Sequence, residues 1–197
     1  MNVMNFGKGL LVASGVALFL QGCALGPENI RVNPAFDLPH SLVGGSKPIA
    51  LSVADAREKK KLGEVGDPNR QMFDVSVNED PAPAISRSVS RALSSLGYVV
   101  EPYRAGDQIP SLTIELQTLK LDSDKRAFDF LTTLRAEVVA HARNGNKTLD
   151  QKYQVTQSMN TPGPAYAKDS SKLVNDAVSS ALQDMLSDQR LLDTLNN

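Results

Sequence analysis

The chemistry of this chain centres on one thiol, Cys23, the only cysteine among its 197 residues. It ends the tetrad Leu20-Gln21-Gly22-Cys23, and an unbroken apolar run over residues 9–20 leads into that tetrad. The run is shorter than the roughly 20 residues that cross a bilayer, but it suits the apolar region of a secretion signal. A second cysteine for a disulfide is absent, and a catalytic thiol needs a histidine packed beside it. Because His40 and His141 occur in unrelated contexts, covalent modification is the chemistry that remains.

The tetrad resembles the lipobox of bacterial lipoproteins, although Gln21 stands where alanine or serine is commoner. In that family the signal is cut before the cysteine, the thiol is diacylated and the new amino group is acylated. The resemblance implies that residues 1–22 are a signal peptide and that Cys23 carries a membrane anchor. An aspartate after the cysteine tends to retain such proteins in the inner membrane. Here that position is Ala24, which implies the outer membrane with the domain facing the periplasm.

The composition narrows the range of partners. The formal net charge is −1, and aromatic residues make up 5% with no tryptophan. A nearly neutral chain has no electrostatic footprint for nucleic acid, and few aromatics are available to stack on bases or sugars. We therefore expect no nucleic-acid partner. Membrane contact is expected to come through the anchor.

Motifs for catalysis, metals and cofactors are not found in the sequence. It has no Cys/His cluster with metal-ligand spacing, no glycine-rich phosphate loop and no Gly-x-Ser-x-Gly elbow. The densest acidic group, Asp122, Asp124 and Asp129, lacks the regular oxygen ligands of a calcium loop and fits a charged hairpin connection better. We expect no cofactor, no metal and no enzymatic activity.

Residues 23–46 follow as a lipidated, proline- and glycine-containing tether, and residues 47–197 form a single domain. Pro27, Pro34 and Pro39 interrupt the tether. Two alternatives are open for it: a free, extended chain, or a segment partly docked on the domain as an edge strand through Phe36 and Leu38.

Two candidate contact surfaces are expected: the polar sheet face that carries Arg135, Glu137 and His141, and a charged segment near the start of the domain. Asp55 and Arg57 are two residues apart on or just past a strand and therefore share a face, where they orient one another or a loop. The run Lys59-Lys60-Lys61 follows. We interpret it as a solvated loop, with a partner-binding patch as the alternative.

Hydrophobic periodicity predicts the elements of the domain. Asn144-Gly145 marks a tight hairpin. The expected strands cover residues 49–53, 72–77, 98–100, 112–121, 128–143 and 147–157, and the expected helices run from about residue 81 to 96 and from 169 or 170 to 186. The predicted fold is α+β: a mostly antiparallel sheet with a three-strand meander and two amphipathic helices on one face.

The order of these features resembles the YajG family of Gram-negative lipoproteins over nearly the whole chain. The matching pieces after the lipobox are Asp55-x-Arg57, Leu96-Gly97-Tyr98-Val99-Val100, Asn144-Gly145-Asn146-Lys147 with Tyr153, and Asn175-Asp176-Ala177-Val178. The resemblance implies a location and a small periplasmic α/β domain, and it brings no established activity.

Two functions remain open. The first is a tethered, non-catalytic adaptor that binds an envelope protein by surface contacts. The alternative is an auxiliary lipoprotein that binds a lipid or other small amphiphile between sheet and helix for envelope transport. A carrier needs an open apolar cavity, whereas an adaptor has a closed core and an exposed contact surface.

Overall fold

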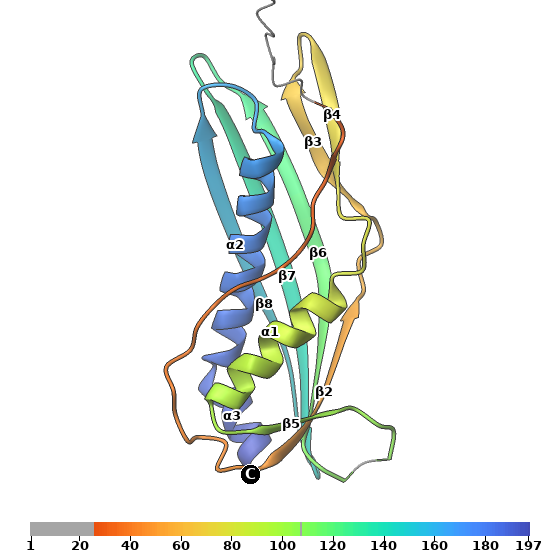
Figure 1. Ribbon diagram of the computed structural model, residues 1–197, viewed down its shortest axis with the longest axis vertical. Helices are drawn as coiled ribbons and strands as arrows, with labels where there is room; N and C mark the ends of the chain where they lie inside the picture. Colours follow the sequence, from red (N-terminus) through yellow and green to blue (C-terminus); the bar gives the residue numbers. More distant parts are fainter. Residues whose placement is uncertain (1–25, 107) are drawn as a thin grey trace, which may run out of the picture.

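The computed structural model describes residues 26–106 and 108–197 and arranges them as helices over one twisted sheet (Figure 1). Cys23, Ala24 and the signal segment lie outside the described residues. The elements, in chain order, are β1 (Glu28–Asn29), β2 (Pro48–Asp55), β3 (Lys61–Asp67), β4 (Gln71–Ser76), α1 (Ala82–Ser95), β5 (Val99–Pro102), β6 (Ser111–Lys125), β7 (Phe130–Asn144), β8 (Lys147–Thr161), α2 (Ala167–Leu186) and α3 (Gln189–Asn196).

The sheet is mixed, which corrects the expected mostly antiparallel arrangement. Its order is β1-β4-β3-β6-β2-β5, and β7 and β8 extend it from β6. Four of its seven described strand pairs are parallel: β1–β4, β2–β5, β2–β6 and β3–β6. In the β2–β5, β2–β6 and β3–β6 pairs the connection between the two strands includes α1, and parallel strands require such a crossover. The pairs β3–β4, β6–β7 and β7–β8 are antiparallel.

Strand β3 is an addition to the expected elements, because the lysine run that leads into it was interpreted as a solvated loop. Leu62 and Val65 are buried on its inner side. Gly63 lies against β6 so closely that a Cβ there would be 1.9 Å from the Leu121 carbonyl oxygen. The glycine therefore permits a close approach of two strands. Lys61 is the first residue of this strand.

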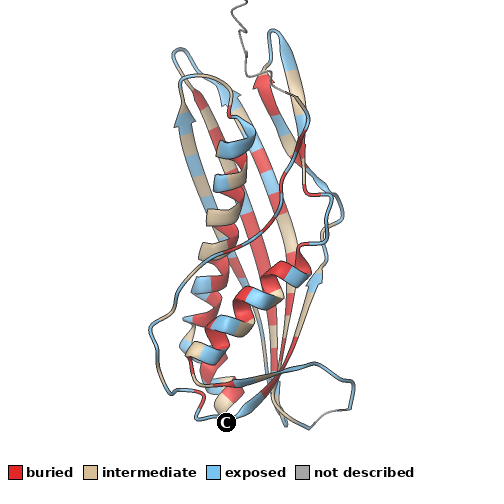
Figure 2. Ribbon diagram, in the orientation of Figure 1, coloured by how far each residue is buried: buried red, intermediate tan, exposed pale blue. Residues whose placement is uncertain are grey.

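The helices cover one face of the sheet, α1 over β2 and β5, and α2 over β7 and β8. The core lies between them, as Figure 2 shows by the buried stripes that face one another. Both predicted apolar helix faces are buried, which confirms them. Those buried side chains are Ile85, Val89, Ala92, Leu93 and Leu96 around α1, and Leu173, Val174, Ala177, Val178, Ala181, Leu182, Met185 and Leu186 in α2. No helix of the described chain is long and apolar enough to cross a membrane.

The helix ends differ in part from expectation. Asp80 accepts a hydrogen bond from the Ala82 amide (2.9 Å) just before α1, although the N-cap residue itself is Pro81. Helix α2 begins earlier than expected, because Asp169 accepts a bond from the Tyr166 amide (3.2 Å) from within the first turn. The leucines after residue 188 form a separate helix, α3, since the Asp188 carboxylate accepts from the Arg190 amide (2.9 Å) and starts a new helix.

Residues 28–46 lie on the domain, in agreement with the docked alternative for this segment. Ile30 and Val32 are 3% and 4% exposed and belong to the core. The segment then crosses α2, where the Asn33 amide donates to Asn175 (2.6 Å) and the Ala35 amide to Ser179 (3.0 Å). The strand that anchors it is β1. Phe36 and Leu38 pack against the core outside any strand, which corrects their predicted edge-strand role.

Candidate functional site

Asp55 and Arg57 form a two-bonded ion pair at the end of β2. Arg57 Nε and Nη2 donate to the two Asp55 carboxylate oxygens at 2.7 and 2.8 Å. The Arg57 side chain is 3% exposed, and its Nη1 has no hydrogen-bond partner. A guanidinium this buried cannot meet a macromolecular partner directly. The pair therefore orients the loop between β2 and β3, which was one of the two roles expected for it.

The three lysines of the predicted contact motif do not share a surface. Lys61 Nζ lies 2.6 Å from Glu64 Oε1 and 2.7 Å from Asp74 Oδ1, and the hydrogen bond to Asp74 is the main reason that its pKa is raised. Lys59 and Lys61 line one hollow with Arg57 and Lys120. Lys60 instead lines a second hollow with Asn78 and Glu79. The run therefore forms no single basic patch.

The polar face of the sheet is the other possible contact surface, and its charged side chains pair with one another. Glu137 is 6% exposed and accepts from Lys152 Nζ at 2.8 Å, while Arg135 donates to Gln154 at 2.6 Å. His141 Nδ1 lies 2.6 Å from Asp150 Oδ1. These cross-strand pairs stabilise β7 and β8.

The largest hollow described is a surface groove of about 820 Å³, which we call the α1–β5 groove. One side is the exposed face of α1, and β5 and the 36–40 segment supply the rest. Its lining includes Phe36, Leu38, His40, Ser94, Arg91 and Val100. The sequence does not reveal this groove, because nothing in it shows that residues 36–40 and β5 flank Arg91 and the serines of α1.

Some polar groups of the groove already hold the N-terminal segment. The Ser88 hydroxyl donates to the Pro34 carbonyl at 2.7 Å, and Arg91 Nη2 donates to Ser88 Oγ at 3.3 Å. Strand β5 pairs only with β2, so its outer edge carries no strand among the described residues. A sheet edge with unpaired backbone groups beside a helix can accept an extended peptide.

A second exposed surface lies at the opposite end of the sheet, and we call it the tip patch. It comprises Phe128 and Tyr166, which are 95% and 47% exposed, with Arg70 and Arg126 beside them. The Lys125–Asp67 ion pair (2.8 Å) joins the two hairpin turns that carry it. Phe128 was expected on the inner face of a strand. It lies instead in the turn before β7, where no sheet face is available to bury it.

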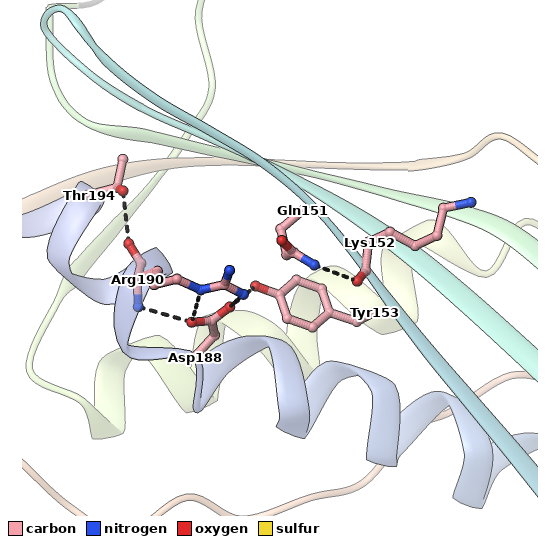
Figure 3. A network of polar contacts seen from close by, with 6 residues as sticks. All are labelled: Gln151, Lys152, Tyr153, Asp188, Arg190 and Thr194. Atoms are coloured by element: carbon pink, nitrogen blue, oxygen red, sulfur yellow. Dashed lines mark hydrogen bonds and ion pairs between the residues drawn. The ribbon is translucent and has the colours of Figure 1, made fainter.

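A polar cluster fixes the junction of α2 and α3 to β8 (Figure 3). The Tyr153 hydroxyl donates to Asp188 Oδ2 at 2.8 Å, and Arg190 Nη2 donates to the same oxygen at 2.7 Å. The Arg190 hydrogen bond lowers the pKa of Asp188 to about 2. Burial, and then the Asp188 carboxylate, raise the pKa of Tyr153. The cluster holds a stable ion and no activated nucleophile, so its role is structural.

Comparison with known proteins identifies the family. Residues 34–196 match the family model Lipoprotein_16, described as an uncharacterized lipoprotein. The chain belongs to this lipoprotein family. The match confirms the family predicted from the lipobox and the motifs that follow it. The curated protein sequences gave no match.

Solved structures are similar to this lipoprotein at low sequence identity. A putative neuraminyllactose-binding hemagglutinin homologue from Helicobacter pylori is 9% identical with a TM-score of 0.54, covering 85% of this chain and 96% of its own. A Xanthomonas campestris protein of the DUF330 family is 12% identical with a TM-score of 0.47, covering 86% and 95%. The lipoprotein GNA1162 from Neisseria meningitidis is 13% identical with a TM-score of 0.34, covering 72% and 99%. The first of these supports the fold, and none assigns an activity.

Proposed function

We propose that this lipoprotein is anchored to the outer membrane through Cys23, faces the periplasm and acts as a non-catalytic adaptor for an envelope protein. The observation that carries the adaptor role is the closed core between sheet and helices. Leu93, Leu112 and Leu182 are all fully buried there, and the hollows found among the described residues open to the surface. Function must then reside on the surface.

The anchor rests on the family and on the tetrad that ends at Cys23. A membrane anchor confines the domain near other envelope proteins, which raises its effective concentration there. Weak surface contacts become sufficient under that condition. The outer-membrane location rests on Ala24 at the sorting position.

The α1–β5 groove is the contact surface we propose, and its occupant is an extended segment of a protein partner. The free edge of β5 offers backbone groups for strand addition, and Phe36, Leu38 and Val100 offer apolar contact for alternate side chains of that segment. Pro102 ends this edge, since proline has no amide to donate, and so limits the added strand to a short stretch. The lysine run is a weaker candidate because Lys60 lines a different hollow from Lys59 and Lys61, and Lys61 is already paired with two carboxylates.

Site-specific photo-crosslinking in intact cells tests this proposal. A photoreactive residue at Ser94, exposed in the groove, should capture an envelope protein that can be identified by mass spectrometry. The matched control is Gln154, exposed on the polar sheet face. Replacing Val100 by proline should reduce capture from Ser94, because it removes a backbone donor from the free edge. Equal capture from Ser94 and Gln154 would contradict the assignment of the groove. So would unchanged capture from Ser94 in a Val100→Pro variant that remains folded.

The carrier alternative draws on the same groove, which has apolar side chains in its lining. An amphiphile is expected to need an enclosed cavity that buries most of its surface, and this groove is open and lined by hydroxyls and Arg91. Mass spectrometry of the purified domain discriminates the two functions. A lipid that co-purifies in stoichiometric amount and is lost on Leu38→Asp would favour the carrier.

A further inference from the structure

The polypeptide enters the domain at the end that carries the tip patch. Glu28 pairs in parallel with Val75 of β4, next to the β3–β4 hairpin. The Glu28 side chain is 8% exposed and lies beside Ser170. Burial raises the pKa of Glu28, and the Ser170 hydroxyl partly offsets that rise. The Ser170 amide in turn donates to the Tyr166 carbonyl at 2.9 Å, so Glu28 is within one helical turn of a tip residue.

The chain between the proposed anchor and this entry point is short. Cys23 and Glu28 are five residues apart, which fully extended chain spans in at most about 17 Å. This step rests on the proposed acylation of Cys23. Given that acylation, β1 lies close to the membrane surface. The domain therefore cannot move freely about a long tether.

Three loops converge at this end, where Figure 1 shows the β3–β4 turn, the β6–β7 turn and the β8–α2 loop together. Their exposed side chains are Phe128 and Tyr166, with Arg70 and Arg126, and no ion pair joins either arginine to another described residue. Two carboxylates also line this hollow: Asp67 is paired with Lys125, and Asp129 is half-buried. Exposed aromatic rings beside unpaired basic groups are the side chains that favour the headgroup region of a bilayer.

We propose that the tip patch (Phe128, Tyr166, Arg70 and Arg126) lies in the phospholipid headgroup region of the membrane that holds the anchor. The occupant of this surface is a bilayer, since the short chain from Cys23 brings a bilayer within reach of it. In this orientation the sheet stands away from the membrane. The α1–β5 groove adjoins Leu51, which pairs with Leu112 near the start of β6, whereas the tip lies past Lys125. At about 3.3 Å per residue, β6 holds the groove about 45 Å from the tip patch.

The absence of tryptophan from the chain provides a direct test. Phe128→Trp places a single fluorophore in the tip patch, and Tyr103→Trp, also exposed but next to β5, is the matched control. The acylated full-length protein is reconstituted into vesicles of phosphatidylethanolamine and phosphatidylglycerol (3:1), with and without brominated acyl chains. We expect the emission of Trp at 128 to shift to shorter wavelength and to be quenched by the brominated lipid. The emission of Trp at 103 should neither shift in wavelength nor be quenched.

Two readouts separate failure of the orientation from failure of the anchor. Intact mass reports acylation of Cys23, and flotation reports membrane attachment of the same sample. An acylated chain that floats while Trp at 128 remains unquenched would overturn the orientation and leave the anchor in place, and would assign the tip patch to another partner. An unacylated Cys23 would refute the anchor and, with it, the reach argument on which the orientation depends.

Discussion

The ion cluster at the α2–α3 junction should make part of the stability of the domain pH-dependent. Asp188 is 13% exposed, and its pKa falls from 3.8 to about 2 in the folded state, chiefly through the hydrogen bond from Arg190. A shift of this size corresponds to about 2 kcal/mol of folding free energy, at 1.36 kcal/mol per pKa unit. Because the folded pKa is depressed, this contribution is present above the unfolded value of 3.8 and is lost as the pH falls through about 2.

Asp188→Asn isolates that charge, because asparagine is also a good N-cap and can still accept from the Arg190 amide at the start of α3. The free energy of unfolding of residues 26–197 is measured by urea titration with circular dichroism at several pH values. At neutral pH the variant should be less stable than the parent by about 2 kcal/mol, and the difference should shrink by about 1 kcal/mol near pH 3.

The control for this experiment is Asp184→Asn, at an exposed position in α2 with no described ion pair. The free energy of unfolding of this variant should stay close to that of the parent at every pH. If instead the Asp188→Asn difference were the same at neutral pH and near pH 3, the carboxylate would not be selectively stabilised in the folded state. The assigned role of the Tyr153–Asp188–Arg190 cluster would then be wrong.

Four further outcomes are expected. Cys23→Ser should abolish metabolic labelling by fatty acid, which equal labelling of parent and variant would contradict. Ala24→Asp should move the protein towards inner-membrane fractions on a density gradient, and an unchanged distribution would show that other signals sort it. Asp55→Ala should destabilise the domain by about 3 kcal/mol in urea unfolding, because it leaves the Arg57 guanidinium buried and unpaired. Removal of residues 26–46 should cost at least about 3 kcal/mol, because Ile30 and Val32 leave the core; an unchanged urea midpoint would refute this.

Local patterns predicted the helices and the tight turn because those features depend on neighbouring residues. The apolar stripe of α2 repeats at helical spacing and has one buried face in the fold. The turn at Gly145 needs a positive φ, which is +57° here, and glycine supplies it without strain. In both cases the residues that decide the structure are adjacent in the sequence.

The pairing of the strands depends on residues that are far apart in the sequence, and local patterns therefore could not predict it. β2 pairs with β6 more than 50 residues later, and β3 is in contact with the same strand at Leu121. Nothing local marks Gly63 as the site where β6 approaches closely. The α1–β5 groove and the tip patch also depend on residues that are far apart in the sequence. The α1–β5 groove needs three separate segments, and Phe128 appears apolar and inward until the turn that holds it is known.

The N-terminal segment connects the two proposed surfaces. It enters beside the tip patch at Glu28, buries Ile30 and Val32, and ends against α1, where the Gly44 amide donates to the Leu96 carbonyl at 2.8 Å. On the way, Phe36 and Leu38 form part of the groove. The chain that would hold the domain to the membrane is thus also a wall of the site proposed for a partner.

This arrangement differs from that of a domain on a free tether. A free chain over residues 24–46 would let the groove sample many distances from the membrane. Here the segment can lengthen only by exposing Ile30 and Val32 and by breaking the bonds from Asn33 and Ala35 to α2. The height of the groove is therefore determined by the length of β6. A partner that binds there should present its extended segment about 45 Å above the membrane surface, at about 3.3 Å per strand residue.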